Sequence, residues 1–600
     1  MSQEENKDMA KHFYRASAAD FMKIPGSPVA YWVSRNFRGC FEKGTPLQEI
    51  APARLGMTSS DNSRFVRQWT EVSFNKVGFH FSSSEKARES GLKWFPYNKG
   101  GEFKKWYGNS TSLINWEYDG KEVMAHASKL YGTPTKTIRN IRYFFKPALT
   151  WSFISSYSFA IRKNDEGHIF DVGGSSAFPP EEKESVILGL LASCLSFEFL
   201  KTVNPTLNFQ AGNVGSIPVI ELQRAEHKVI DDLCERAVKL SRTDWNSYEL
   251  SFDFISFPLL NPDLFKNKIS KNYKELRACW HNMTDEIQNI ERKNNRIFIH
   301  AYGLQDEMTS DASLEKVTLE CNPHYRYGVT RSREELETLL QCDTIRELVS
   351  YAIGCNMGRY SLDKPGLIIA SQGETLKDFL SEVPSPKFVP DEDAILPLTD
   401  QEWFPDDATN RFGEFVCTVW SKEHLQENLD FVAESLCLHA IKPRRGESAL
   451  ETIRRYMSTQ FYKDHLRTYK KRPIYWLFSS GKQKAFECLV YLHRYNESTL
   501  ARMRTEYVIP LSAKLNTYAD KLEQDIDAST STAETKRLEK EVATLHKQQI
   551  ELAEFDEKLR HYADQRISLN LDDGVKINYG KFGNLLAETK AVTGNKEALL

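Results

Sequence analysis

The sequence lacks the short motifs that mark most nucleotide-dependent enzymes and hydrolases. It has no glycine-rich loop ending in Gly-Lys-Ser or Gly-Lys-Thr, no HExxH segment and no Gly-x-Ser-x-Gly turn. Gly173-Gly174 stands without the flanking pattern of a dinucleotide-binding turn. These absences argue against nucleotide hydrolysis, a dinucleotide cofactor, zinc-dependent proteolysis and serine hydrolase chemistry. No catalytic centre is visible in the chain.

Cysteine is sparse and scattered, with ten cysteines in 600 residues and no CxxC pair. This spacing indicates neither a zinc ribbon nor a thioredoxin-like site, and it fits reduced, mostly buried thiols. His324, His465 and His493 are isolated in the sequence, so we expect packing or surface roles for them. We therefore predict no metal site and no cofactor bound by this chain alone.

Long apolar runs and a strong net charge are also missing. The most apolar stretch, Val186–Leu195, is too short to cross a bilayer, and the polar N-terminus has no signal segment. We expect a cytoplasmic protein without membrane contact. Because the net charge is only −3 at pH 7, any binding of nucleic acid must depend on local basic patches.

Six hundred residues are too many for one hydrophobic core, so several domains are expected. Strand-like and helical patterns both occur, which predicts an α+β multidomain fold. The chain divides into an N-terminal linker (1–50), a mixed α/β region (51–225), a helical spacer (226–305), a second mixed α/β region (306–510), and a helical hairpin with a C-terminal tail (511–600).

Within these regions, local patterns predict individual elements. Aromatic and β-branched residues between Gly, Ser and Pro breaks indicate strands, and apolar residues every three or four positions indicate helices. The predicted strands are Ile141–Phe145, Ser152–Ile161 and His168–Val172, and the predicted helices are Glu182–Leu200, Leu222–Ser241 and Leu264–Glu291.

The C-terminal region predicts two helices that pack against each other. Apolar residues at helical spacing begin at Leu511, stop at the polar break 528–532, and resume from Leu538 to Tyr562, with Gln549 interrupting the seam. Two helices joined by a short polar turn form an antiparallel hairpin, and thirty helical residues extend about 45 Å. A docking arm and an ordinary surface helix pair both fit this pattern.

The stretch from Lys93 to Asn109 is the most informative part of the sequence. It combines aromatics, amides, cations and the glycine pair Gly100-Gly101. Cations suit phosphates, aromatics stack, and Asn can read the edge of a base, so this mixture is typical of a DNA-contacting surface. An aromatic-rich hairpin buried in a core has the same composition, and the two interpretations remain open.

Three other segments combine cations with polar or aromatic residues. Ser59–Arg67 looks like a turn at the start of a helix, which suits either a phosphate or a plain N-cap. Tyr469–Trp476 places three cations beside aromatics, as a clamp on a DNA backbone or as a solvated face. Arg359-Tyr360 suits cation–π packing at the rim of a core or a contact surface.

Several strings together resemble one family. They are Asp61–Phe65, Lys93–Asn109, Thr150–Ser152, Asn204–Val219, Gly358–Gly366, Lys470–Gly481, His493–Tyr495 and Leu571–Phe582. On these strings the chain is similar to the C-terminal half of PglX, the adenine-specific DNA methyltransferase of BREX phage-defence systems, which is related to the type IIG restriction–modification enzymes. The similarity runs from about residue 50 to residue 590.

The resemblance implies methyl transfer from S-adenosylmethionine to adenine by the full-length enzyme. The family performs this step with an N-terminal domain that carries a glycine-rich loop and an NPPY-type loop. Both are missing here, and Asn322-Pro323-His324-Tyr325 lacks the second proline. We therefore expect a truncated product, a split subunit or a C-terminal fragment that is inactive alone, in which residues 51–225 form a target-recognition domain.

Two functions follow as hypotheses. The first is sequence recognition of double-stranded DNA for a methyltransferase core or other defence-complex subunits. The second is a scaffold that docks such subunits or a phage DNA-mimic inhibitor. The candidate DNA contacts are Ser60, Asn62, Arg64, Arg67, Asn98, Lys99, Lys104, Lys105, Asn109, Lys470, Lys471 and Arg472.

Overall fold

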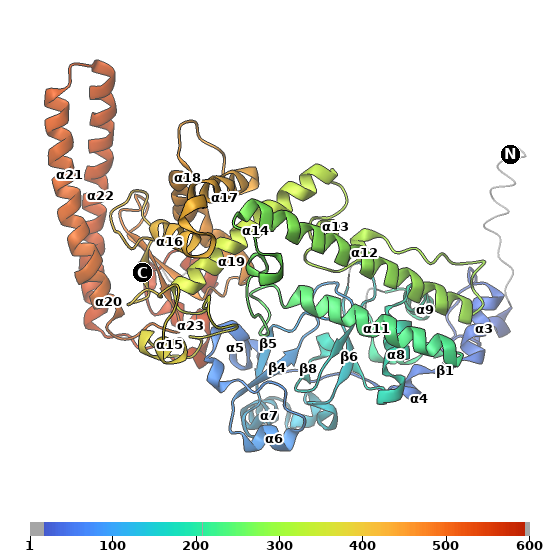
Figure 1. The fold of residues 1–600 in the computed structure, drawn as a ribbon. Helices are drawn as coiled ribbons and strands as arrows, with labels where there is room; N and C mark the ends of the chain where they lie inside the picture. The colour runs from blue at the N-terminus through green and yellow to red at the C-terminus, as the bar shows by residue number, and fades with distance from the viewer. Residues whose placement is uncertain (1–16, 156, 207, 595–600) are drawn as a thin grey trace, which may run out of the picture. The chain divides into compact units, whose positions relative to one another are not determined.

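The computed structural model describes residues 17–155, 157–206 and 208–594 (Figure 1). The described residues divide into two compact units, each assembled from separate segments of the chain. The first unit contains the segments up to Arg67, Val77–Asn246 and Cys279–Thr330, and the second contains Gln68–Lys76, Ser247–Ala278 and Arg331 onward. The start of the predicted N-terminal linker and the end of the predicted tail lie outside the described residues.

The first unit is built around two small sheets, which agrees with the predicted α+β class. One has the strand order β2 (Ala53–Arg54), β9 (Ser176–Ala177), β6 (Ala148–Trp151) and β7 (Ile161–Asn164). The other has the order β3 (Val66–Gln68), β5 (Ser112–Asn115), β4 (Trp94–Asn98) and β8 (Ile169–Phe170). β4 pairs antiparallel with β5, opposing Phe95 to Ile114, and parallel with β8, opposing Tyr97 to Ile169.

Aromatic side chains fill the core beside β4. Phe95 lies edge-on to Phe145 at 5.6 Å between ring centroids, and Phe144 lies edge-on to both Trp116 and Phe170, at 5.2 and 5.6 Å. Edge-to-face packing is favourable because the positive ring edge meets the negative ring face. The aromatic richness of this region therefore serves the core of the first unit.

The predicted strands differ from the observed ones. Residues 141–143 form the 3-10 turn η4 (Ile141–Tyr143), which starts from left-handed Asn140, and most of Ser152–Ile161 is irregular. Only His168–Val172 contains a strand, the short β8. The first two predictions were wrong because aromatic and β-branched residues here lie in turns, some in the core, such as Phe145 and Phe159, and some exposed, such as Ile154. Composition does not separate these uses from a strand.

The predicted helix Glu182–Leu200 is two helices, α8 (Glu184–Ala192) and α9 (Cys194–Val203). Ser193 is extended between them; its hydroxyl donates to Leu190 O at 2.6 Å, and Asn295 Oδ1 accepts from Cys194 N at 3.0 Å. Among the described residues no single helix is long and apolar enough to span a membrane; α8 and α9, with the turn at 181–183, satisfy that test only as a pair bent by 73°.

The remaining long helices of the middle region are close to prediction. α11 (Arg224–Trp245) matches the predicted helix Leu222–Ser241, and α12 (Ile269–Ala301) begins and ends later than the predicted Leu264–Glu291. Pro262 and the 3-10 turns η7 (Pro258–Leu260) and η8 (Pro262–Leu264) precede α12, so its first predicted residues belong to turns.

The second unit combines helices with one three-stranded antiparallel sheet. Its strand order is β11 (Ile395–Pro397), β13 (Glu487–Tyr491) and β12 (Tyr475–Ser479). Arg359 is fully buried in this unit and donates to the hydroxyls of Tyr360 at 3.1 Å and Tyr491 at 2.8 Å. The segment Arg359-Tyr360 is therefore a core element. The other long helices are α14 (Arg333–Asn356), α16 (Ala408–Trp420) and α17 (Leu425–His439).

The predicted helical hairpin is confirmed. α21 (Ile509–Ala528) and α22 (Thr532–Asp564) run side by side in opposite directions at the red end of the chain in Figure 1. Gln549, the polar residue of the seam, donates to Asn516 Oδ1 at 2.8 Å. The buried seam residues are Leu511, Leu515, Leu522, Leu538, Val542, Leu545, Leu552, Phe555 and Leu559.

Candidate nucleic-acid interface

The amide of Asn98, at the end of β4, is used inside the first unit. Asn98 is buried, its Nδ2 donates to Gly174 O at 3.1 Å and to Thr150 Oγ1, and its Oδ1 accepts from Gly100 N at 3.3 Å. The donors and acceptor that would read a base edge already have partners in the fold. In this conformation Asn98 fixes the turn that follows β4.

Lys105 and Trp106 share one buried carboxylate. Glu291, on α12, forms an ion pair with Lys105 Nζ and accepts from Trp106 Nε1 at 3.0 Å. All three residues are less than 8% exposed. Because a buried charge is stable only when paired and hydrogen-bonded, this carboxylate holds the segment after β4 against α12.

Lys104 has acidic partners on a different segment. Its Nζ lies 2.7 Å from Glu320 Oε1, and Asp244 anchors the same segment by accepting from the backbone N of Glu320 at 2.7 Å. Burial lowers the pKa of Lys104, but the charges of Glu320, Tyr325 and Asp244 outweigh it and raise the pKa overall. Lys104 is therefore a charged, internally neutralised side chain.

For Asn98, Lys104 and Lys105 the structure shows the buried-hairpin arrangement. Lys104 Nζ and Lys105 Nζ would have to leave Glu320 and Glu291 to reach a DNA phosphate. Arg67 is also buried, donating to Ser63 O at 2.7 Å and Val66 O at 2.8 Å. In this conformation the side chains of all four predicted contacts bond inside the first unit instead of standing at its surface.

The other predicted residues of the first unit include a group that the fold brings together. Asn62 Oδ1 accepts from Ser59 Oγ at 2.8 Å and from Lys99 Nζ at 3.3 Å, although Asn62 and Lys99 are 37 positions apart. Lys99 Nζ also lies 3.1 Å from Asp171 Oδ2. Asn62 and Arg64 are exposed and Lys99 is half-buried, so the Asn62–Lys99 contact brings an ammonium beside the turn that carries the amide and the guanidinium.

The local backbone explains how the turn presents these groups. Ser60 has a positive φ of 64°, and the side chain of Asp61 caps the four-residue helix α5 (Asn62–Phe65) by accepting from Arg64 N at 3.1 Å. Asp61 thus accepts from the backbone at this helix start, which agrees with the N-cap interpretation. Asn109 also has a positive φ, 65°, and donates to Glu102 O at 2.8 Å.

The last three predicted contacts belong to the second unit. Lys470 and Lys471 are exposed and occupy consecutive left-handed positions, with φ of 49° and 59°. Arg472 Nε lies 3.9 Å from Glu71 Oε2. Together with the half-buried Arg472, the exposed Lys470 and Lys471 form a basic turn directly before β12.

Sequence reasoning missed a second basic group in the first unit, defined here as the Tyr143 cluster: Arg54, Arg142, Lys146 and Tyr143. The three cations lie 5.4, 5.1 and 5.8 Å from the centre of the Tyr143 ring. A signal was present, because no acidic residue occurs between Glu122 and Asp165, while seven Lys or Arg do.

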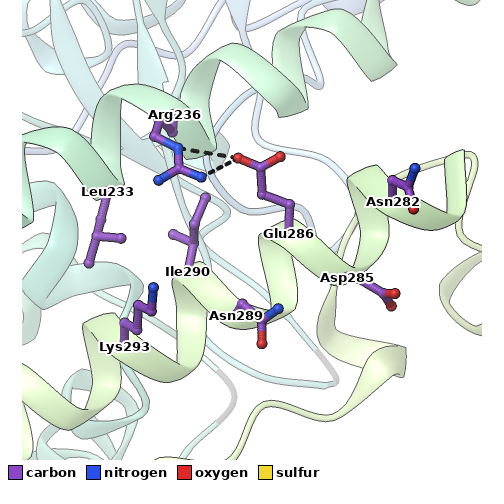
Figure 2. A pocket seen from close by; sticks show the side chains of 8 residues that line it. All are labelled: Leu233, Arg236, Asn282, Asp285, Glu286, Asn289, Ile290 and Lys293. Carbon is purple, nitrogen blue, oxygen red and sulfur yellow. Dashed lines mark hydrogen bonds and ion pairs between the residues drawn. The ribbon is translucent and has the colours of Figure 1, made fainter. Parts of the chain in front are cut away.

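A surface pocket of about 310 Å³ lies between α11 and α12 of the first unit (Figure 2). Arg236 bonds to Glu286 across it, with an N–O distance of 2.5 Å, and Leu233, Asn289 and Lys293 contribute to its lining. Its main charges thus neutralise each other. In the described part of the chain, no group of three or more His, Cys, Asp or Glu side chains could hold a metal ion.

Comparisons with known proteins give two close relatives. The chain is 45% identical over 581 residues to the "Adenine-specific methyltransferase BrxX" of Escherichia coli O9:H4 (strain HS), matching 96% of this chain and 46% of that protein. It is 36% identical over 591 residues to the "Adenine-specific methyltransferase PglX" of Lacticaseibacillus casei (strain Zhang), matching 97% of this chain and 46% of that protein. No protein-family model matches.

The chain therefore spans about half the length of the curated relatives that it matches. The expected resemblance is confirmed: over nearly its whole length, this chain is homologous to about half of the PglX and BrxX adenine-specific methyltransferases.

Proposed function

We propose that this chain is the DNA sequence-recognition portion, corresponding to the C-terminal half, of a BREX-type adenine-specific DNA methyltransferase. Its relatives carry the name of that activity, and the chain matches 46% of each. The glycine-rich and NPPY-type loops expected for S-adenosylmethionine chemistry are missing from this sequence. Methyl transfer is then supplied by a methyltransferase core outside this chain, in the cytoplasm, and this chain binds no cofactor of its own.

The observation that carries this proposal is the group formed by the exposed residues Asn62 and Arg64 and the half-buried Lys99. The Asn62–Lys99 contact, 3.3 Å between Oδ1 and Nζ, brings an amide and a cation onto one surface. Asn suits the N6 and N7 atoms of adenine in the major groove, and Arg and Lys suit phosphates. In this proposal Asn62 Oδ1 exchanges its bonds from Ser59 and Lys99 for a base, and Lys99 leaves Asp171 to join Arg64 in positioning the duplex.

In this proposal the remaining predicted residues shape the recognition surface or add a further contact to the DNA backbone. Ser60 and Asn109 shape left-handed turns, and Lys470, Lys471 and Arg472 form a second backbone contact. The buried residues Arg67, Asn98, Lys104 and Lys105 hold the recognition surface in shape. Adenine leaves the stack for a pocket that the methyltransferase core provides, because the exocyclic amine is not accessible for this chemistry inside a duplex.

Binding of the 600-residue chain to duplexes, with and without the methylated site, tests the proposal. We expect affinity to fall linearly with log salt concentration, and Arg64→Gln with Lys99→Gln to reduce the slope by about one for each lost phosphate contact. Lys239→Gln, an exposed cation on α11, is the matched control. A chain indifferent to DNA at low salt would exclude this function.

A second candidate function is a scaffold for defence-complex subunits or for a phage DNA-mimic inhibitor. The hairpin α21–α22 favours it, since Ile550 on α22 is 65% exposed and offers an apolar contact beside charged faces. Purified partner subunits distinguish the two functions. If Ile550→Lys abolishes their binding while DNA binding of the chain is absent, the scaffold is the correct function.

A further inference from the structure

The Tyr143 cluster combines cations from two parts of the chain on one aromatic ring. Arg54 Nε donates to the Tyr143 hydroxyl at 3.3 Å, and Arg142 NH2 donates to it at 3.5 Å. Lys146 lies 5.8 Å from the ring centre. Cation–π attraction holds each cation near the ring, but three like charges at this spacing still repel one another.

Within the described part of the chain, no carboxylate pairs with these three cations. None of them forms an ion pair with any residue in the described ranges, in contrast to Lys104 and Lys105. Arg142 and Lys146 are exposed and Arg54 is half-buried. The hydrogen bond from Arg54 is the largest influence that lowers the pKa of Tyr143, which agrees with an electropositive surrounding.

The cluster is fixed to the core of the first unit. The Tyr143 ring packs on Phe178 at 4.5 Å between centroids, and Phe178 packs on buried Phe170 at 5.4 Å. Arg54 lies on β2, opposite Ser176 of β9. Left-handed backbone at Asn140 and Phe145, with φ of 57° and 66°, bends the segment that carries Arg142 and Lys146. A preorganised cluster of this kind loses little freedom when it binds an anion.

The same segment is joined to the turn that carries Asn62 and Arg64. Thr58 N donates to Thr137 O at 2.9 Å, and Asn140 Nδ2 donates to Leu55 O at 2.8 Å. Lys136 and Arg139 flank Thr137 and are exposed. Cations therefore continue from the Tyr143 cluster towards the proposed recognition surface, as a DNA strand with regularly spaced phosphates requires.

We propose that the Tyr143 cluster binds backbone phosphates of the duplex beside the surface formed by Asn62, Arg64 and Lys99. This inference rests on the proposed function and adds contacts to it. The guanidinium groups of Arg54 and Arg142 can donate in pairs to phosphate oxygens, and Lys146 adds a point charge. Phosphate contacts position a duplex without reading its sequence, so the cluster sets affinity and orientation rather than specificity.

The test uses the full 600-residue chain with the triple variant Arg54→Gln, Arg142→Gln and Lys146→Gln. We expect affinity for a duplex to fall roughly 10- to 100-fold at moderate salt, equally with and without the recognised site, and the salt slope to fall by about two to three. The double variant Lys228→Gln, Lys239→Gln removes two exposed cations of α11 and is expected to change neither quantity measurably.

Three outcomes decide the inference. A folded triple variant, with an unchanged circular dichroism spectrum and urea midpoint, that keeps wild-type affinity and slope overturns it. If that variant binds normally while Arg64→Gln with Lys99→Gln weakens binding, the inference fails and the proposed function stands. If inorganic phosphate binds the cluster at micromolar concentration and the duplex does not compete, the site serves a small anion and the inference is again overturned.

Discussion

Two segments of the first unit are both rich in cations and aromatics, but the fold buries the cations of one and exposes those of the other. In Lys93–Asn109, Lys104 and Lys105 are buried and paired with Glu320 and Glu291. In Lys136–Lys146, the cations are exposed, and those around Tyr143 have no carboxylate partner among the described residues. Composition alone does not separate the two segments. The difference lies in where the acids are, because a cation that is buried with a carboxylate partner, as Lys104 and Lys105 are, is not available to a phosphate.

The largest expected effect comes from removing the carboxylate partner of a buried cation. Glu291→Ala leaves Lys105 and the Trp106 indole without their buried partner, which costs about 3–5 kcal/mol because an uncompensated charge stays in the core. Urea unfolding monitored by tryptophan fluorescence measures the loss. Glu286→Ala, also on α12 but in an exposed pair with Arg236, is the control and should leave the urea midpoint nearly unchanged. Equal costs for the two variants would contradict the structural role of Glu291.

A second prediction extends the comparison to Glu249, a half-buried residue whose carboxylate has one enclosed oxygen and bonds to two hydroxyls instead of a cation. Burial is the main cause that raises the pKa of Glu249 from 4.5 to about 7, against hydrogen bonds from Ser350 and Tyr469 that lower it. The folded state therefore holds this proton more tightly than the unfolded chain. Its contribution to stability is complete below pH 4.5 and is lost as the pH rises through about 7.

The expected size of this loss is about 3 kcal/mol, at about 1.4 kcal/mol for each unit of pKa difference. Urea midpoints of the second unit at pH 4.5, 6 and 8 measure it. Glu249→Gln should flatten the decline, and the exposed Glu434→Gln on α17 should leave it unchanged. A decline that persists undiminished in Glu249→Gln would show that another group causes it.

A third prediction compares the exposed, unpaired Lys146 directly with the buried, paired Lys104. Lys146→Met should weaken duplex binding about three- to tenfold through a lost phosphate contact, with stability unchanged within about 0.5 kcal/mol. Lys104→Met should lower the urea midpoint but leave duplex affinity unchanged where the chain is folded. Titrations at two salt concentrations, paired with urea curves, measure both. If the effects are exchanged between the two variants, the assignment of paired and unpaired cations is wrong.

The smallest effect concerns the hydroxyl of Tyr143. Tyr143→Phe keeps the ring beneath Arg54, Arg142 and Lys146 and removes only two long hydrogen bonds of 3.3 and 3.5 Å. Such exposed bonds contribute less than about 1 kcal/mol, so duplex affinity should change less than about fivefold. Tyr143→Ala removes the ring as well and should bind more weakly. Equal affinities of the two variants would show that the ring does not organise the cations.

Helical features were predictable from sequence where the pattern is local and long. The seam from Leu511 to Tyr562 fixes the hairpin because every apolar position repeats within one or two turns. The break at Ser193 was not predictable, because the acceptor that caps α9 is Asn295, about one hundred positions away. The short strands of the first unit likewise depend on pairing between distant segments.

The candidate site could be predicted only in part from the sequence. Aromatics and cations correctly drew attention to Lys93–Asn109, but the carboxylates that neutralise Lys104 and Lys105 lie some two hundred positions further along the chain. The absence of acids between Glu122 and Asp165 is a local signal for the exposed cations of Lys136–Lys146, although Arg162 in the same stretch is fully buried and Lys163 pairs with Glu184. The contact between Asn62 and Lys99 needed the fold, since Asn62 lies on α5 and Lys99 follows β4.

If the proposed function holds, the carboxylates of Asp244, Glu291 and Glu320 also limit how the first unit can be recombined between relatives. A chimera that exchanged residues 51–225 alone would transplant Lys104 and Lys105 while leaving those acids with the recipient. Segment Cys279–Thr330 belongs to the same compact unit and supplies Glu291 and Glu320. A chimera should therefore also exchange that segment and α11. The lysines and the acids that pair with them then come from the same parent protein.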